Sequence, residues 1–338
     1  MAYGLPEAKA VEAALMQEIK ETTPIASITV QQLFEEYIAA KSYEVRETTL
    51  DKTKRILQAE VITPLGSKSL AKLDKRVLQN WKNDIAGRSL AIRTKKNFFK
   101  EFAAMLNWAV KMDYIPKNHL SALGNFRDTS LDAHAKSLHF YTAEQFKSYI
   151  AVAHDNSNTL ADWGYYVFFC IAFYTGARKG EINALKWSDI EDDVMHIRRS
   201  IAQKLKGGDR ETAPKNKSSI RDIKLPAPLI DILTEHKTRQ QEDPSFSEDW
   251  RICGGITTLR DTTIDHKNRS FAKAADLPHI RVHDFRHTHA TLLINEGINI
   301  QEIARRLGHS NVQITWSVYA HLYPREEDRA LSVLNKIK

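Results

Sequence analysis

The stretch that decides the fold of this chain is residues 283–289, His-Asp-Phe-Arg-His-Thr-His, followed by Leu-Gly-His at 307–309 and by Tyr319. The tyrosine lies ten positions after the histidine of Leu-Gly-His. This spacing puts a phenol, an arginine and histidines within one short helical region. A nucleophile, an anion-binding group and partners for proton transfer are therefore expected at one site.

Two upstream segments add to this set. Residues 175–181, Thr-Gly-Ala-Arg-Lys-Gly-Glu, contain a second arginine, and residues 214–219, Pro-Lys-Asn-Lys-Ser-Ser, contain lysines between two strand-like runs. Guanidinium groups stay charged and bind two phosphate oxygens in a planar fork. Arginines, histidines, a lysine and a tyrosine together suit phosphoryl transfer from a nucleic-acid backbone, without metal, cofactor or ATP.

Composition limits the class of protein. The chain has 338 residues, which suits two domains, and its 42% apolar and 27% charged residues are typical of a globular protein. It contains no run of eighteen apolar residues and no basic segment followed by an apolar one at the N-terminus. Its two cysteines form no CxxC pair. A reducing, cytoplasmic setting is therefore expected.

The positive charge is unevenly distributed. The net charge is +7, and residues 28–123 hold 17 Lys and Arg against 10 Asp and Glu. Residues 139–338 are nearly balanced, with 28 against 26. The N-terminal half thus carries the excess that a polyanion would feel, although such charge is also typical of a solvated helical surface. Within it, three lysines are expected to reach phosphates: Lys95, Lys96 and Lys100.

Hydrophobic periodicity and capping residues predict a mainly α fold with a small β-sheet or hairpin (α+β). A helical domain is expected over 28–123, a linker over 124–138 and a mixed, mostly helical domain over 139–338. Residues 1–27 are interpreted as an N-terminal helix and tail. Helices are expected near 48–60, 74–86, 91–112, 163–174, 228–241, 262–275, 284–296, 299–306 and 311–321, and strands over 194–201 and 220–225.

The separated motifs, in this order, resemble the tyrosine recombinase (phage integrase) family, most closely the integrases of temperate phages and integrative elements. The resemblance extends over roughly residues 28–323. It implies a tyrosine recombinase-like catalytic domain preceded by a helical SAM-like core-binding domain. It also implies a site-specific DNA recombinase that cleaves and rejoins DNA through a 3′-phosphotyrosine, so that a mobile element is integrated or excised.

The resemblance assigns roles residue by residue. Tyr319 would be the nucleophile, since its spacing from Gly-His fits the family better than that of Tyr323. The phosphate would be held by Arg178, Arg286, His283 and His309. Lys215 would protonate the leaving 5′-oxygen, with Lys217 as the alternative and as a DNA contact. Glu181 would orient a basic partner.

Other interpretations compete with parts of this assignment. Residues 283, 287 and 289 are histidines, and histidines four apart on a helix can bind zinc. No HExxH and no cysteine pair accompanies them, so helix packing or support of neighbouring groups is favoured for His287 and His289. A type IB topoisomerase shares the chemistry, and a DNA-binding protein that has lost catalysis would share the fold.

The expected partners follow from the recombinase interpretation. Double-stranded DNA at attachment sites would be the substrate, bound by a homotetramer. DNA-bending and directionality proteins from the host or the element would be further partners. Integrases of this type usually carry an arm-binding domain before the core-binding domain; here residues 1–27 precede it, and residues 7–20 resemble only the helix that often closes such a domain. Either the chain lacks that module or it begins inside it.

Overall fold

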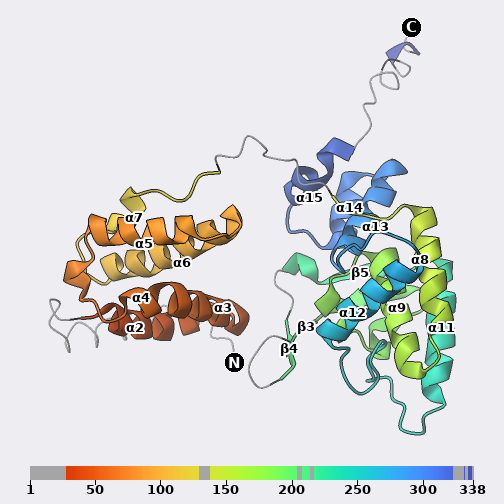
Figure 1. Cartoon of the computed structure of the whole chain (residues 1–338). Helices are drawn as coiled ribbons and strands as arrows, with labels where there is room; N and C mark the ends of the chain where they lie inside the picture. The colour runs from red at the N-terminus through yellow and green to blue at the C-terminus, as the bar shows by residue number, and fades with distance from the viewer. Residues whose placement is uncertain are drawn as a thin grey trace. The chain divides into compact units, whose positions relative to one another are not determined.

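The computed structural model describes residues 28–128, 138–203, 208–213, 217–322, 331 and 334–336. The chain divides into two compact units, Met1–Ala135 and Lys136–Lys338, and each is considered by itself (Figure 1). The helix expected within residues 1–27 and most of the expected linker lie outside the described residues. Over the described part of the chain, no helix is both long and apolar enough to cross a membrane.

The N-terminal unit is a bundle of helices around one buried core. The threonine hydroxyl of Thr29 accepts a hydrogen bond from the Gln32 amide nitrogen at 3.2 Å, while the Gln32 side chain accepts one from the Thr29 nitrogen at 2.9 Å. These two bonds satisfy free N–H groups where the first helix begins. The helices are α2 (Val30–Glu44), α3 (Glu47–Leu57), α4 (Thr63–Leu65), α5 (Lys75–Gly87), α6 (Ile92–Lys111) and α7 (His119–Ala122).

A wider turn interrupts the helix expected over 48–60. The α-helix ends at Leu57, and Gln58–Ile62 form a π-helical turn. Pro64 follows, and its ring nitrogen has no hydrogen to donate to the carbonyl of Glu60 four residues back. The indole nitrogen of Trp81 donates to that carbonyl instead, at 2.6 Å. Proline thus explains the change of helix type, and Trp81 satisfies the carbonyl it leaves.

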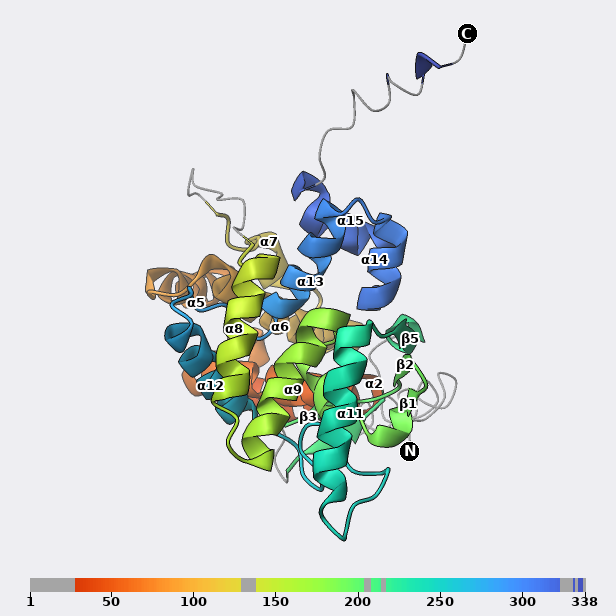
Figure 2. The ribbon, with the colours of Figure 1, turned by 90° about the vertical axis from the view of Figure 1, so that its right-hand side faces the viewer.

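The C-terminal unit is built around α9 (Leu160–Thr175), most of which is buried. Figure 2 shows α9 between α8 and α11, both of which contact it. Helix α9 begins three residues before the expected 163, because the Thr159 hydroxyl accepts a hydrogen bond from the Asp162 nitrogen at 3.1 Å. The other helices are α8 (Ala143–Asp155), α10 (Lys179–Ala184), α11 (Ala227–Gln241), α12 (Asp261–Ala274), α13 (Asp284–Asn295), α14 (Ile300–Leu307) and α15 (Val312–Tyr319).

The strand expected over 194–201 is wrong in extent, because two strands occupy it. Strand β2 (Val194–Ile197) pairs antiparallel with β1 (Ile190–Glu191) and β5 (Arg221–Lys224), so that Ile197 faces Arg221. Strand β3 (Ser200–Ala202) pairs in a second sheet with β4 (Arg210–Thr212).

The two residues between β2 and β3, Arg198 and Arg199, belong to neither strand. Arg198 donates to the carboxylate of Asp222 at 2.6 Å, and Arg199 donates to that of Asp189 at 2.5 Å. The ion pairs anchor the chain where it passes from one sheet to the other. The fold class is confirmed: the described residues are mainly helical, with two small antiparallel sheets.

Candidate active site

The turn after α9 determines where Arg178 lies. Gly176 has a left-handed conformation (φ 63°), and a Cβ atom there would lie 2.8 Å from side-chain carbons of both His289 and Leu307. Only glycine allows this approach without displacement. The chain therefore turns tightly against α13 and α14, and Arg178 follows at the N-terminus of α10.

Glu181 connects Arg178 to a second arginine. Its carboxylate, in a residue only 4% exposed, accepts from Arg178 at 2.7 Å and from Arg221 at 2.9 Å. Burial would raise the pKa of Glu181, but the charges and hydrogen bonds of Arg221 and Arg178 bring it below its ordinary value. The carboxylate thus fixes the direction of two guanidinium groups, and the Arg178 side chain remains 38% exposed.

Arg221 is a member of the site that the motifs did not indicate. Its Nε donates to the carbonyl of Arg306 at 2.6 Å, and the residue is 6% exposed. A signal exists in the sequence, because Arg221 shares a strand face with Ile223 in an alternating segment. A charged residue at an inward-facing strand position needs a buried partner.

Arg286 is buried among carbonyl groups. It lies on α13, is 3% exposed, and donates to the carbonyls of Gly176 at 2.9 Å and Leu307 at 2.6 Å. Burial, together with the charges of Arg178 and Arg221, lowers the pKa of Arg286 to about 9. Neutral carbonyls orient this guanidinium, while the positive charges of its neighbours disfavour its charged form. A bound anion would therefore stabilise the charged form.

The Leu-Gly-His segment, residues 307–309, lies against Arg178 and Arg221. Gly308 is left-handed (φ 65°), and a Cβ there would lie 2.9 Å from Nη1 of Arg221. The Gly308 carbonyl accepts a hydrogen bond from Arg178 at 3.5 Å. The next residue, His309, has its Nδ1 2.7 Å from the Thr315 hydroxyl. Burial and the charges of Arg286 and Arg178 lower the pKa of His309 to about 4, so the ring is neutral at neutral pH.

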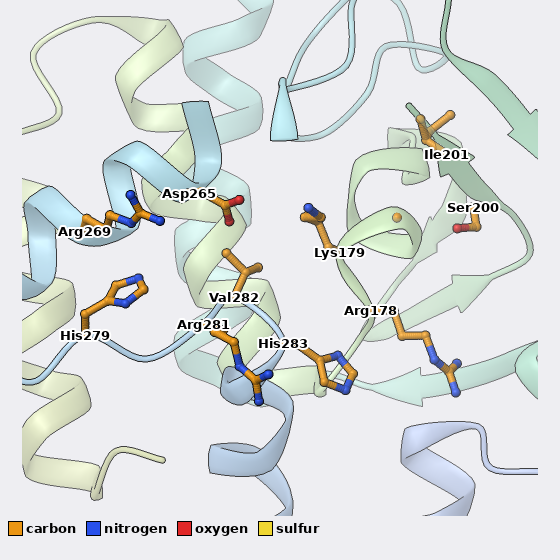
Figure 3. A pocket seen from close by; sticks show the side chains of 11 residues that line it. Arg178, Lys179, Ser200, Ile201, Asp265, Arg269, His279, Arg281, Val282 and His283 are labelled. Atoms are coloured by element: carbon orange, nitrogen blue, oxygen red, sulfur yellow. The ribbon is translucent and has the colours of Figure 1, made fainter. Parts of the chain in front are cut away.

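His283 lies at a basic cleft beside these residues. A cavity of about 550 Å³ is lined by Arg178, His283 and further basic residues. Figure 3 shows Arg178 and His283 in one part of this cleft and Arg269 in another. His283 as a whole residue is exposed, but partial desolvation of its ring and the neighbouring His287 lower its pKa to about 4. The remaining residues of the lining are Lys179, Gly180, Ser200, Ile201, Asp265, His279, Arg281 and Val282.

Tyr319 ends α15 and is almost completely buried, at 1% exposed. Its ring packs with apolar side chains of α13 and α14. The phenolic oxygen lies 2.7 Å from Nδ1 of His287. Burial raises the pKa of Tyr319 to about 12, and Arg286 opposes this shift. Of the residues assigned from the sequence, the structure thus gathers Arg178, Arg286, His283, His309 and Tyr319 around the start of α13 and the end of α14.

Other assigned residues lie elsewhere. Lys215 and Tyr323 lie outside the described residues, and Lys217 begins a short 3₁₀ turn that ends at Ser219. In the N-terminal unit, Lys95 donates to the carbonyl of Ala86 at 2.6 Å. Lys100, on the same helix, is exposed, and Lys96 is half-buried.

Of the three histidines at 283, 287 and 289, the first two pack ring against ring, with centroids 5.4 Å apart, and the third has a partner elsewhere. His289 is buried, and its Nδ1 lies 2.8 Å from the carbonyl oxygen of Phe173, whereas His287 contacts Tyr319. In the part of the chain that the structure describes, no three histidine, cysteine or acidic side chains gather as a metal-binding group.

The fold and this gathering of arginines, histidines and a tyrosine define a class of enzyme that transfers DNA strands. Residues 139–326 match the model of the phage integrase family, and residues 29–86 match the N-terminal SAM-like domain of phage integrases. The chain therefore belongs to the phage integrase family of tyrosine recombinases, and it is a site-specific recombinase of mobile DNA.

Known proteins are similar over nearly the whole chain. The ICEBs1 integrase of Bacillus subtilis strain 168 is 27% identical over 340 residues, which cover 98% of this chain and 90% of that protein. The Tn1549 transposon integrase in complex with circular intermediate DNA has the same fold, with a TM-score of 0.69 and 19% identity over 92% of this chain and all of that one. A lambda integrase tetramer bound to a Holliday junction gives a TM-score of 0.60 at 16% identity, over 91% of this chain and 82% of that one.

Proposed function

We propose that Tyr319 is the nucleophile that attacks a DNA phosphodiester. Its oxygen forms a bond to phosphorus, the bond to the 5′-oxygen breaks, and the DNA is left as a 3′-phosphotyrosine with a free 5′-hydroxyl. The ester conserves the energy of the broken bond, so the reverse attack rejoins the strand without ATP. The observation that carries this proposal is that Tyr319 and the oriented arginine Arg286 lie together on packed helices.

The phosphate is held by Arg178, Arg286, His283 and His309. Negative charge grows on the non-bridging oxygens as the phosphorus is attacked, and donors fixed beforehand stabilise it without rearranging. Arg178 is fixed by Glu181, and Arg286 is fixed by two backbone carbonyls. Removal of one such donor lowers the rate by roughly 10²–10³-fold in other enzymes.

The proton for the leaving 5′-oxygen comes from Lys215 in this proposal, with Lys217 as the alternative. Both belong to the segment before β5, whose Arg221 reaches Glu181. The assignment rests on the sequence.

Within the N-terminal unit, residues 28–123 form the core-type DNA-binding domain. Its lysines at 95, 96 and 100, with Lys217 of the catalytic domain, contact DNA phosphates. Four copies assemble on two attachment sites, as the lambda integrase tetramer does on a Holliday junction. Proteins of the host or the element assist the tetramer by bending the DNA or by favouring integration or excision. The reaction takes place on DNA in the bacterial cytoplasm.

A nicked duplex of the element's own attachment site tests the nucleophile. The nick lets the short strand diffuse away after cleavage, so a covalent protein–DNA adduct accumulates. The adduct is expected with the unaltered chain and with Tyr323→Phe, and it is expected to be absent with Tyr319→Phe. An adduct that persists in Tyr319→Phe and disappears in Tyr323→Phe would move the nucleophile to residue 323.

The same duplex identifies the general acid. With a 5′-phosphorothiolate at the cleavage point, the leaving sulfur needs no proton. Lys215→Ala is expected to cleave the ordinary substrate slowly and the sulfur substrate at the normal rate. If Lys217→Ala behaves in this way and Lys215→Ala does not, the acid is Lys217.

A further inference from the structure

The side chain that contacts the proposed nucleophile is His287, which the motifs favoured only as a packing or supporting residue. Its Nδ1 lies 2.7 Å from the Tyr319 oxygen, and the two ring centroids are 5.6 Å apart at an interplanar angle of 62°. Tyr319 is almost completely buried, and His287 is half-buried. A short hydrogen bond that is shielded from water on one side constrains the position of the phenol.

We propose that His287 positions Tyr319 for attack and accepts its phenolic proton. The inference rests on the proposed role of Tyr319 as nucleophile. With the ring proton on Nε2, Nδ1 accepts the hydrogen bond from the phenol. As the Tyr319 oxygen bonds to phosphorus, its proton passes to Nδ1, and the leaving 5′-oxygen takes a proton from the lysine general acid. In rejoining, the 5′-hydroxyl attacks, and the imidazolium returns its proton to the Tyr319 oxygen.

Three other groups near the tyrosine have hydrogen-bond partners of their own. Nδ1 of His309 pairs with the Thr315 hydroxyl, and the Arg286 guanidinium donates to two carbonyls. The Asp284 carboxylate is held by Arg281 at 2.8 Å and 3.0 Å. Among the described residues, His287 is the side chain with a hydrogen bond to the Tyr319 oxygen.

The groups around His287 keep its ring neutral and therefore able to accept a hydrogen bond. Burial lowers its pKa, which keeps the ring neutral at neutral pH, and Asp284 opposes that shift. A neutral ring accepts, whereas an imidazolium only donates. Asp284 also stabilises the cation once it forms. The charged and titratable groups facing the ring are Asp284, Arg281, Arg286, His283 and Tyr319.

Two substitutions test the role of the Nδ1 acceptor and of proton transfer to it. His287→Phe keeps a ring of similar size but has no acceptor. His287→Asn places an amide oxygen near the position of Nδ1 but cannot take up a proton. Single-turnover cleavage of the nicked duplex is measured at saturating protein from pH 6 to pH 9, with the 5′-phosphorothiolate substrate in parallel.

At neutral pH both variants are expected to cleave roughly 10²–10⁴-fold more slowly than the unaltered chain, which is the usual contribution of a positioned acid or base. The loss is expected to shrink as the pH rises, because solvent then removes the phenolic proton. Sulfur as leaving group should not restore either variant, whereas it restores the lysine variant. DNA affinity should be unchanged, because His287 makes no proposed DNA contact.

Cleavage by either variant within about threefold of normal at neutral pH would overturn the proposal. So would a loss that is the same at every pH. The adduct in the unaltered chain, and its absence in Tyr319→Phe, are measured in the same experiment. If the adduct persists in Tyr319→Phe, the proposed nucleophile fails; if only the His287 variants keep normal rates, this inference alone fails.

A measurement without substitution at position 287 guards against misfolded variants. Nitrogen NMR of ¹⁵N-histidine-labelled protein reports which ring nitrogen carries the proton. The expected result is a proton on Nε2 of His287 and none on Nδ1, with the Nδ1 signal shifting in Tyr319→Phe. A neutral ring with its proton on Nδ1 would contradict the inference.

Discussion

Glu181 offers the sharpest test of how the arginines are held. Glu181→Gln removes the single carboxylate that accepts from both Arg178 and Arg221, in a residue that is 4% exposed. Loss of one partner from a buried ion pair costs about 3–5 kcal/mol, because a charge is left buried without compensation. A domain of roughly 200 residues loses about 2–4 °C of melting temperature per kcal/mol. The catalytic unit should therefore melt about 6–20 °C lower.

The matched control is Glu302→Gln. Glu302 also pairs with an arginine, Arg305, through contacts of 2.6 Å and 2.7 Å, but its side chain is 42% exposed. Exposed pairs contribute about 0.2–1 kcal/mol, so the melting temperature should fall by at most about 4 °C. Thermal unfolding followed by circular dichroism measures both variants. Equal shifts in the two variants would refute the view that burial makes the Glu181 pairs strong.

The pH dependence of this difference has a definite sign. The folded-state pKa of Glu181 is lowered, so its stabilising effect is fully present above the unfolded-state value and is lost as the pH falls through the folded value. The unaltered chain and Glu181→Gln should therefore differ most at neutral pH and converge in acid. A gap in melting temperature that widens as the pH falls would contradict the assignment of a charged carboxylate.

Three further outcomes are expected. Gly308→Ala forces a left-handed alanine whose Cβ lies 2.9 Å from Arg221, so unfolding of the catalytic unit in urea should become easier by about 1–3 kcal/mol. Arg269→Ala removes an exposed arginine that lines the cleft, and the loss of one phosphate contact should lower the slope of log affinity against log salt by about 0.9 in DNA titrations. Trp81→Phe leaves the Glu60 carbonyl without its donor and should destabilise the N-terminal unit by about 1–3 kcal/mol, measured by urea unfolding of the whole chain, with no loss for the catalytic unit.

Much of the fold was predictable because its signals are local. Capping boxes form at Thr29 and Gln32 and at Thr142 and Gln145. Each depends on residues three apart, and the chain supplies both partners at once. Helical periodicity is equally local, which explains why most helix ends lie within a few residues of their expected positions.

Features that depend on distant partners were not predictable in this way. Strand β4 (Arg210–Thr212) is short and polar, and only its pairing with β3 makes it a strand. The sequence therefore offered no reason to divide 194–201. Similarly, the contact of His287 with Tyr319 joins residues 32 positions apart. It depends on how α13 and α15 pack, and no spacing rule within one helix reports that.

The excess of positive charge at the site affects both the stability of the free protein and the binding of the proposed substrate. The described residues bring together three guanidinium groups, Arg178, Arg221 and Arg286, around the carboxylate of Glu181. Two of the three are buried, and the pKa of Arg286 is lowered first by burial and further by the charges of Arg178 and Arg221. A phosphodiester would add one negative charge where positive charge is in excess. The repulsion that Arg178 and Arg221 exert on the buried Arg286 in the free protein is therefore relieved when the proposed substrate binds, and the attraction to the phosphate strengthens as negative charge grows on it during attack.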